Sequence, residues 1–244
     1  MHIAIVGGKR VRIRLADDLR EERSHSVSLS ADLYHTFGKV QTNLLVEGFY
    51  TILDDVFALR DMDDAADGGK VKERYNGSGA TVRGFNVEGR AAFTRWFELQ
   101  AGVTLQQSRY KEPEFWSEDA EVPPVRRMFR TPDAYGYFTA SFKPVRNFTA
   151  DLSGTCTGSM LVQHMAGSGV AQDVAVSTPS FFDMNIRLSY DVRIYKEITM
   201  QLYGGVQNLF NAYQKDFDKG VDRDSGYILS LIHISEPTRL DVIS

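Results

Sequence analysis

An acidic stretch after residue 60 has the residue types that bind hard metal ions. Four aspartates lie within seven residues and are followed by two glycines: Asp61, Asp63, Asp64 and Asp67. Calcium prefers several carboxylate oxygens, so such a loop could bind it. The spacing does not match an EF-hand, and acidic loops are usually only solvated. We therefore expect no cofactor, and keep calcium at Asp61, Asp63 and Asp64 as the alternative.

A second stretch, residues 112–130, combines aromatic and basic side chains. These side chains are Phe115, Trp116, Arg126, Arg127 and Phe129. Aromatic rings and guanidinium groups in a polar loop are typical of surfaces that contact a ligand. The alternative is a loop that packs on itself and on lipopolysaccharide. We therefore predict these five residues as candidate ligand-binding residues.

The remaining composition excludes several kinds of chemistry. Cys156 is the single cysteine, so neither an intrachain disulfide nor a cysteine metal cluster can form. The net charge of −4 provides no basic footprint for nucleic acid. No Ser/His/Asp set and no paired carboxylates stand on a recognisable scaffold. The sequence therefore predicts neither an enzyme nor a nucleic-acid partner.

The elements that position these residues are indicated by a two-residue period. Apolar and polar residues alternate over segments of about ten residues within 26–33, 97–106, 148–162, 182–191 and 198–207. One apolar set runs from Phe148 to Val162 and includes Cys156. A helix would place such a set on all sides, so the pattern predicts strands. Mid-strand charges such as Asp151 and Arg187 must then face water, because a charge facing lipid costs about 2–4 kcal/mol.

The connections between these segments alternate in length. Tight turns are expected near residues 37–40, 94–96, 143–147 and 193–197, and long polar stretches at 61–74, 112–130, 164–179 and 211–226. Short turns on one side and long loops on the other are typical of a transmembrane β-barrel. A soluble sandwich also alternates polar and apolar residues. Its strands are usually about five or six residues long, however, and it lacks aromatic residues gathered near strand ends.

Three motifs resemble those of one receptor family. The most specific is GVQNLFNAY, residues 205–213, which is similar to an Asn-Leu-Phe-Asp/Asn-x-x-Tyr signature. Residues 18–24 and 75–89 resemble two further family patterns. In this order and spacing, the motifs resemble the C-terminal barrel of TonB-dependent outer-membrane receptors over about residues 3–228. The motif residues are Asn208, Leu209, Phe210, Asn211 and Tyr213.

The resemblance implies an all-β chain, an antiparallel transmembrane β-barrel fragment with about eight to nine strands of a 22-stranded, plugged barrel. It implies a bacterial outer-membrane receptor that takes up a scarce nutrient, such as a siderophore, haem, cobalamin or glycan, in a TonB-dependent way. Implied partners are outer-membrane lipid and lipopolysaccharide, an N-terminal plug and the remaining strands, TonB through that plug, and a small ligand.

The two ends of the chain lead to separate expectations. We expect residues 1–228 to be a partial C-terminal barrel that lacks the plug and any signal peptide. Residues 229–244 resemble translated sequencing-adapter read-through, so we expect them to be non-native. A soluble β-rich binding module and a passive porin-like barrel remain alternatives, and ligand identity and oligomeric state stay open.

Overall fold

The computed structural model describes residues 2–6, 9–62, 70–117, 119, 121–164, 166–167 and 169–212. Within these ranges it contains fifteen β-strands and no helix long and apolar enough to cross a membrane. Several residues singled out above lie outside the described ranges: Asp63, Asp64, Asp67, Tyr213 and the tail 229–244.

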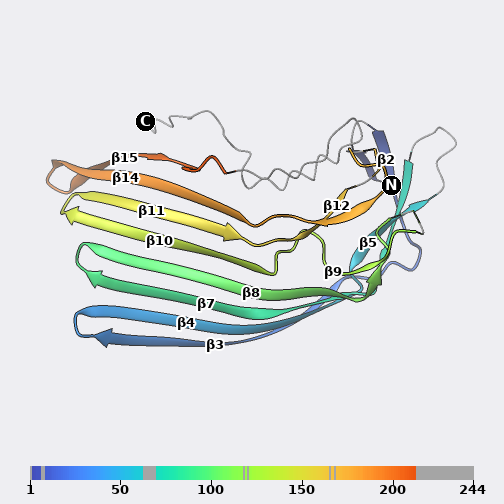
Figure 1. The fold of residues 1–244 in the computed structure, drawn as a ribbon, viewed down its shortest axis with the longest axis horizontal. Coiled ribbons are helices and arrows are strands. Elements are labelled where there is room, and N and C mark those ends of the chain that lie inside the picture. The colour runs from blue at the N-terminus through green and yellow to red at the C-terminus, as the bar shows by residue number, and fades with distance from the viewer. Residues whose placement is uncertain are drawn as a thin grey trace.

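A curved sheet of long strands makes up most of the structure (Figure 1). In sheet order, its strands are β3 (Arg23–Phe37), β4 (Val40–Asp54), β7 (Ala80–Thr94), β8 (Phe97–Glu114), β10 (Ala134–Val145), β11 (Phe148–Thr157), β14 (Phe181–Tyr195) and β15 (Ile198–Val206). A short ninth strand, β9 (Val125–Arg127), pairs with β8. Every pairing in this sheet is antiparallel. The expected barrel segment of eight to nine strands is confirmed.

The tight turns all lie at one end of the sheet. They join β3 to β4, β7 to β8, β10 to β11 and β14 to β15, at the left of Figure 1. Gly38, with φ of 64°, supplies the left-handed conformation that the first turn requires. At the opposite end, the connections are longer and contain the short strands.

Two smaller sheets stand at the loop end. The first has the order β1 (His2–Val6), β2 (Lys9–Leu15), β6 (Lys70–Asn76) and β5 (Phe57–Met62), and its β2–β6 pair is parallel. The second pairs β12 (Leu161–His164) with β13 (Val174–Ser177). Residues 61–74, expected as loop, therefore include strand residues. The predicted strand from Phe148 to Val162 is also divided.

The division of that strand has a local cause. The backbone N–H of Gly158 donates to the carbonyl oxygen of Ala134 at 2.7 Å, just after β11 ends. A Cβ at Gly158 would lie 2.7 Å from the same oxygen, so only glycine allows this approach. The chain then leaves the sheet and forms β12.

Strand register sorts the side chains onto two faces. Leu152 lies between Ala140 and Ile186 across three neighbouring strands, while Asp151 lies between Ser141 and Arg187. Because paired residues share a face, one face is mainly apolar and the other mainly polar along the long strands. We call them the outer face and the inner face. Cys156, paired with Gly136 and Phe182, lies on the outer face as the alternation predicted.

The outer face leaves large apolar side chains uncovered. Val27 is 73% exposed, Leu29 82% and Leu202 54%. Among the described residues, the buried apolar side chains are small, namely Ala16, Ala80, Ala140 and Val162. Uncovered apolar surface on this scale marks a face that meets another apolar phase.

Aromatic rings gather on the outer face near the tight turns. The Phe97 ring stacks on Phe93 at 5.3 Å and on Phe142 at 4.7 Å between centroids, and Trp96 lies 6.1 Å away. Aromatic residues at this level form the girdle of a membrane barrel, where ring edges meet the headgroups.

Candidate functional site

The inner face carries a ladder of hydrogen-bonded polar side chains. Tyr137 of β10 donates to Glu88 of β7 at 2.6 Å, and the Gln100 amide donates to the same carboxylate at 2.8 Å. Glu88, Gly102 and Tyr137 are register partners on three adjacent strands. Since Gly102 has no side chain, the Tyr137 ring can lie across β8 and reach Glu88.

Further polar pairs extend the ladder to the neighbouring strands β4 and β11. Asn86 donates to Glu47 at 2.9 Å and accepts from Thr104 at 2.8 Å. Arg90 pairs with Glu98, and Ser141 donates to Asp151 at 2.6 Å. These hydrogen bonds and the ion pair fix the carboxylates of the inner face in place.

The candidate loop residues separate into two groups. Phe115 is 75% exposed, and Arg126 is exposed. Trp116 and Phe129 instead pack edge to face at 5.5 Å between ring centroids. The structure therefore leaves Phe115 and Arg126 available at the loop surface, while Trp116 and Phe129 hold the loop's two ends together.

Arg127 also belongs to the packed group. Its guanidinium donates to the Ser159 carbonyl oxygen at 2.8 Å and pairs with Asp133 at 2.9 Å. This links the loop that carries β9 to the segment that follows β11. Arg127 was predicted to contact a ligand, but its guanidinium already makes contacts within the fold.

A further contact, which the sequence does not indicate, joins the loops. Ser117 donates to the carboxylate of Asp173 at 2.6 Å, and the other oxygen of Asp173 accepts from the backbone N–H of Ala166 at 2.7 Å. Ser117 and Asp173 are 56 residues apart. No periodic signal connects them, because the contact depends on how the loops meet beyond the sheet.

Two carboxylates at the loop ends of the strands have shifted pKa values. The Lys111 ammonium hydrogen-bonds to Asp54 and lowers the pKa of that carboxyl. Burial raises the pKa of Glu114. Asp54 is the last residue of β4 and Glu114 is the last residue of β8. Both groups therefore lie at the loop end of the sheet, opposite the tight turns.

The family-motif residues end the last described strand. Asn208 and Asn211 take positive φ values of 52° and 49°. The Asn208 amide exchanges two 2.7 Å hydrogen bonds with the backbone of Ala212. The N–H of Leu209 donates to Met184 at 2.8 Å, and the Phe210 ring lies 6.3 Å from Phe182. The motif thus docks the chain back onto β14.

The predicted calcium site falls mainly outside the described ranges. Asp61 is part of β5, whereas Asp63 and Asp64 are not described. Across the described parts of the chain, no group of three His, Cys, Asp or Glu side chains could hold a metal ion.

Several solved structures of receptors and transporters share the fold. The ferric-catecholate import receptor Fiu from Escherichia coli K12 superposes with a TM-score of 0.57 at 16% identity, over 86% of this chain and 26% of its own. The FrpB iron transporter from Neisseria meningitidis gives 0.54 at 16%, over 88% and 30%. The outer membrane transporter YddB from Escherichia coli gives 0.53 at 15%, over 84% and 30%. The chain thus spans about a quarter to a third of these proteins.

Sequence comparison gives the family. No curated protein matches the chain. The family model described as "TonB dependent receptor-like, beta-barrel" matches residues 5–209, most of the 244. The chain therefore belongs to the TonB-dependent receptor-like β-barrel family, whose members are outer-membrane receptors and transporters rather than enzymes.

Proposed function

We propose that the chain forms part of the barrel wall of an outer-membrane receptor that imports a scarce nutrient by energy-coupled transport. The observation that carries the proposal is the sorting of the two faces, with Asp151 and Arg187 on the inner face and Leu152 and Ile186 on the outer face. A wall of this kind suits lipid on one side and a hydrated, plugged lumen on the other.

The orientation follows from the connections. In such barrels the short turns are periplasmic and the long connections extracellular. The small sheets, the β9 loop and the β12–β13 hairpin would then face the medium, where a nutrient is first captured. Phe115 and Arg126 are the candidate residues whose side chains are free to meet a ligand there.

Energy coupling would come from other parts of the receptor. The solved neighbours are three to four times longer than the matched segment, which leaves room for a plug and the remaining strands. TonB would act through that plug. The ligand class is a siderophore, haem, cobalamin or glycan. Because some solved neighbours are named as iron and copper transporters, a metal chelate is the first ligand to test.

The test is uptake by the intact receptor that contains this segment. Bacteria that express it would be supplied with a labelled ferric siderophore, haem, cobalamin or oligosaccharide, with and without functional TonB. We expect accumulation of one class only, and its loss without TonB. Accumulation that continues unchanged without TonB would instead indicate a passive porin.

A further inference from the structure

The four tight turns of the sheet carry a concentrated positive charge. Residues 37–40, 94–97, 143–148 and 193–198 contain six basic side chains and a single acidic one, Glu197. Six basic residues against one acidic residue give these turns a formal charge of +5, while the whole chain carries −4. All six basic side chains are exposed, and we call them the basic rim: Lys39, Arg95, Lys143, Arg146, Arg193 and Lys196.

The rest of the described structure does not neutralise the basic rim. Two carboxylates lie just inside the turns, but Glu98 pairs with Arg90, and Asp191 accepts a hydrogen bond from the Gln201 amide at 2.9 Å. In the parts of the chain that the structure describes, no cation of the rim forms an ion pair. The rim therefore presents its charge to whatever lies beyond the turns.

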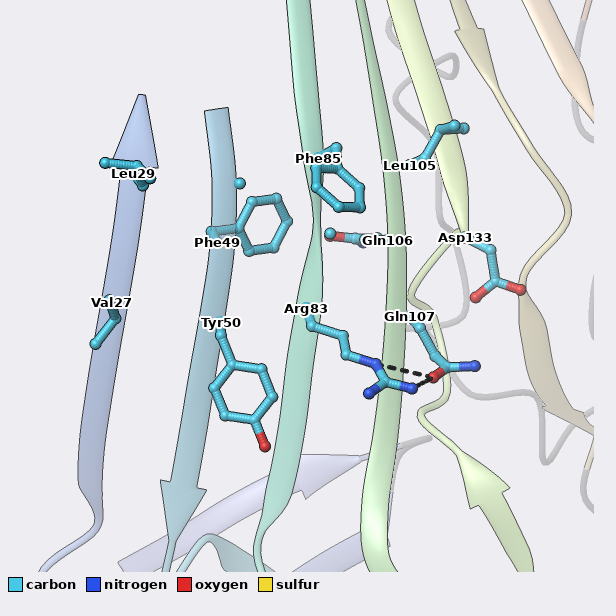
Figure 2. Close-up of a pocket in the computed structure, with 12 residues that line it drawn as sticks. Val27, Leu29, Phe49, Tyr50, Arg83, Phe85, Leu105, Gln106, Gln107 and Asp133 are labelled. Atoms are coloured by element: carbon cyan, nitrogen blue, oxygen red, sulfur yellow. Dashed lines mark hydrogen bonds between the residues drawn. The ribbon is translucent and has the colours of Figure 1, made fainter. Parts of the chain in front are cut away.

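Cations at the opposite, loop end of the sheet have partners within the fold. Arg83 of β7 donates to the amide oxygen of Gln107 on β8 at 3.2 and 2.8 Å (Figure 2). In the basic rim, one described guanidinium, that of Arg193, donates within the fold, to the carbonyl oxygen of Lys196 at 2.5 Å. The difference shows that the turns hold their cations outward instead of using them to fix the sheet.

The cations stand in a row. The four turns join consecutive strand pairs along one rim of the sheet, at the left of Figure 1. Because neighbouring strands are about 4.8 Å apart, consecutive turns are about 10 Å apart. A single small anion can reach one or two of these turns, whereas an extended chain with repeated acidic groups can contact all four. The spacing therefore fits a polyanion better than a single ion.

Part of the basic rim lies on the water side of the wall. Arg193 pairs in register with Thr199 and shares the inner face with Asp191. Lys143 follows Ser141 by two residues and donates its backbone N–H to Trp96 at 2.7 Å, so it continues the inner-face series of β10. These two cations stand at the mouth of the lumen and not on the side that meets lipid. A partner in the aqueous phase can reach them.

We propose that the basic rim binds the peptidoglycan, the carboxylate-bearing polymer of the periplasm, and so holds the receptor against the cell wall. Each exposed contact between a cation and a carboxylate contributes little, but a repeating polymer makes several at once. The proposal rests on the proposed orientation, with the tight turns in the periplasm. It depends neither on the imported nutrient nor on energy coupling.

The test measures sedimentation of the receptor with purified peptidoglycan. The intact receptor that contains this segment, in nanodiscs of zwitterionic lipid, is mixed with native sacculi or with sacculi whose carboxylates have been converted to amides. We expect at least tenfold weaker binding to the amidated sacculi, and weaker binding to native sacculi as salt is raised. The assay needs no nutrient and no TonB, so its failure and a failure of uptake are separate results.

Paired variants locate the contact on the turns. Arg95→Gln combined with Arg146→Gln should weaken binding to native sacculi about fivefold, because two exposed charge contacts are lost. Arg20→Gln combined with Arg109→Gln, the same exchange at two exposed positions of the loop end, is the matched control and should change nothing. Equal binding to native and amidated sacculi, or equal effects of the two pairs, would overturn the proposal.

Two further measurements keep the test decisive. If the variant of the two turn arginines does not fold, Lys39→Gln combined with Lys196→Gln takes its place, with the same expected loss. Anionic lipids bound in mixed nanodiscs are counted by native mass spectrometry. A turn variant that loses bound anionic lipid but sediments with sacculi like the parent would show that the rim contacts headgroups, and the proposal would be wrong.

Discussion

Tyr137 donates a 2.6 Å hydrogen bond to Glu88 across an intervening strand, and the tyrosine ring lies over Gly102 of that strand. A Cβ at Gly102 would lie 2.7 Å from the ring. Gly102 and Tyr137 therefore act as one unit. Because Gly102 has no side chain, the Tyr137 ring can cross β8, and its hydrogen bond links β10 to β7.

This unit predicts a specific loss when the hydroxyl is removed. Tyr137→Phe should lower the free energy of unfolding by about 1 kcal/mol, because the carboxylate loses a donor while the ring keeps its place. Tyr135→Phe, on the same strand and face, is the control. Urea unfolding in lipid vesicles measures both. Equal effects of the two variants would show that the bond to Glu88 contributes nothing of its own.

The ion pair between Lys111 and Asp54 predicts a pH response at the loop end. Because Lys111 lowers the pKa of Asp54, the pair's stabilisation is present above the carboxyl's unfolded pKa, near 4, and is lost as pH falls through the lower folded pKa. The protection factors for amide exchange at the ends of β4 and β8, taken relative to the intrinsic exchange rate at each pH, should therefore fall below about pH 4. Lys111→Gln should remove this response, and a response that persists in the variant would contradict the assignment.

Glu114 should respond in the opposite direction. Burial raises its pKa, so folding favours the protonated acid, and its contribution to stability is lost as pH rises through the raised value. Glu114→Gln should reduce the dependence of stability on pH in that range. It should also protect the end of β8 from amide exchange at neutral pH. A variant less protected than the parent at pH 7 would show that the charged form has a stabilising partner.

Substitutions of the candidate loop residues should lower ligand affinity at some positions and stability at others. Phe115→Ala and Arg126→Ala should weaken capture of the imported ligand by about tenfold each and leave unfolding unchanged, because both side chains are exposed. Trp116→Ala should instead destabilise the loop by about 1 kcal/mol from the ring pair alone. Ligand titration and limited proteolysis distinguish the two outcomes. Phe115→Ala that binds normally would remove Phe115 from the site.

Cys156 provides a direct test of the two faces. In a bilayer, its thiol should react about tenfold or more slowly with a charged maleimide than a cysteine placed at Thr155 in a Cys156→Ser background, because the charged reagent does not enter the lipid that covers the outer face. Detergent-free vesicles and a mass readout suffice. Equal rates at both positions would be incompatible with a lipid-facing Cys156.

The sequence predicted the long strands well, and the reason is physical. A wall with lipid on one side and water on the other requires strict alternation, so Leu152 and Asp151 could be assigned to opposite faces from their positions alone. Tight turns were equally visible, since they interrupt the alternation at regular intervals.

The loop end was not predictable in the same way. β2 pairs in parallel with β6, about 60 residues further along, and no local pattern identifies such a partner. Gly158 ends β11 through a contact with Ala134 that only the folded sheet creates. Of the candidate loop residues, composition could not tell the packed Trp116 from the exposed Phe115, because both are aromatic residues in the same polar stretch.

The parallel β2–β6 pair also constrains the order in which the chain assembles. The β3–β4 hairpin brings Arg23 and Asp54 into register, and these are the points where the chain leaves toward β2 and β5. Once the hairpin exists, the loop that the parallel pair must close becomes short, and its entropic cost falls. Without the hairpin, the pair would have to form across the whole intervening segment, which is slow. The small sheet should therefore form late in folding, after the adjacent part of the wall is in place.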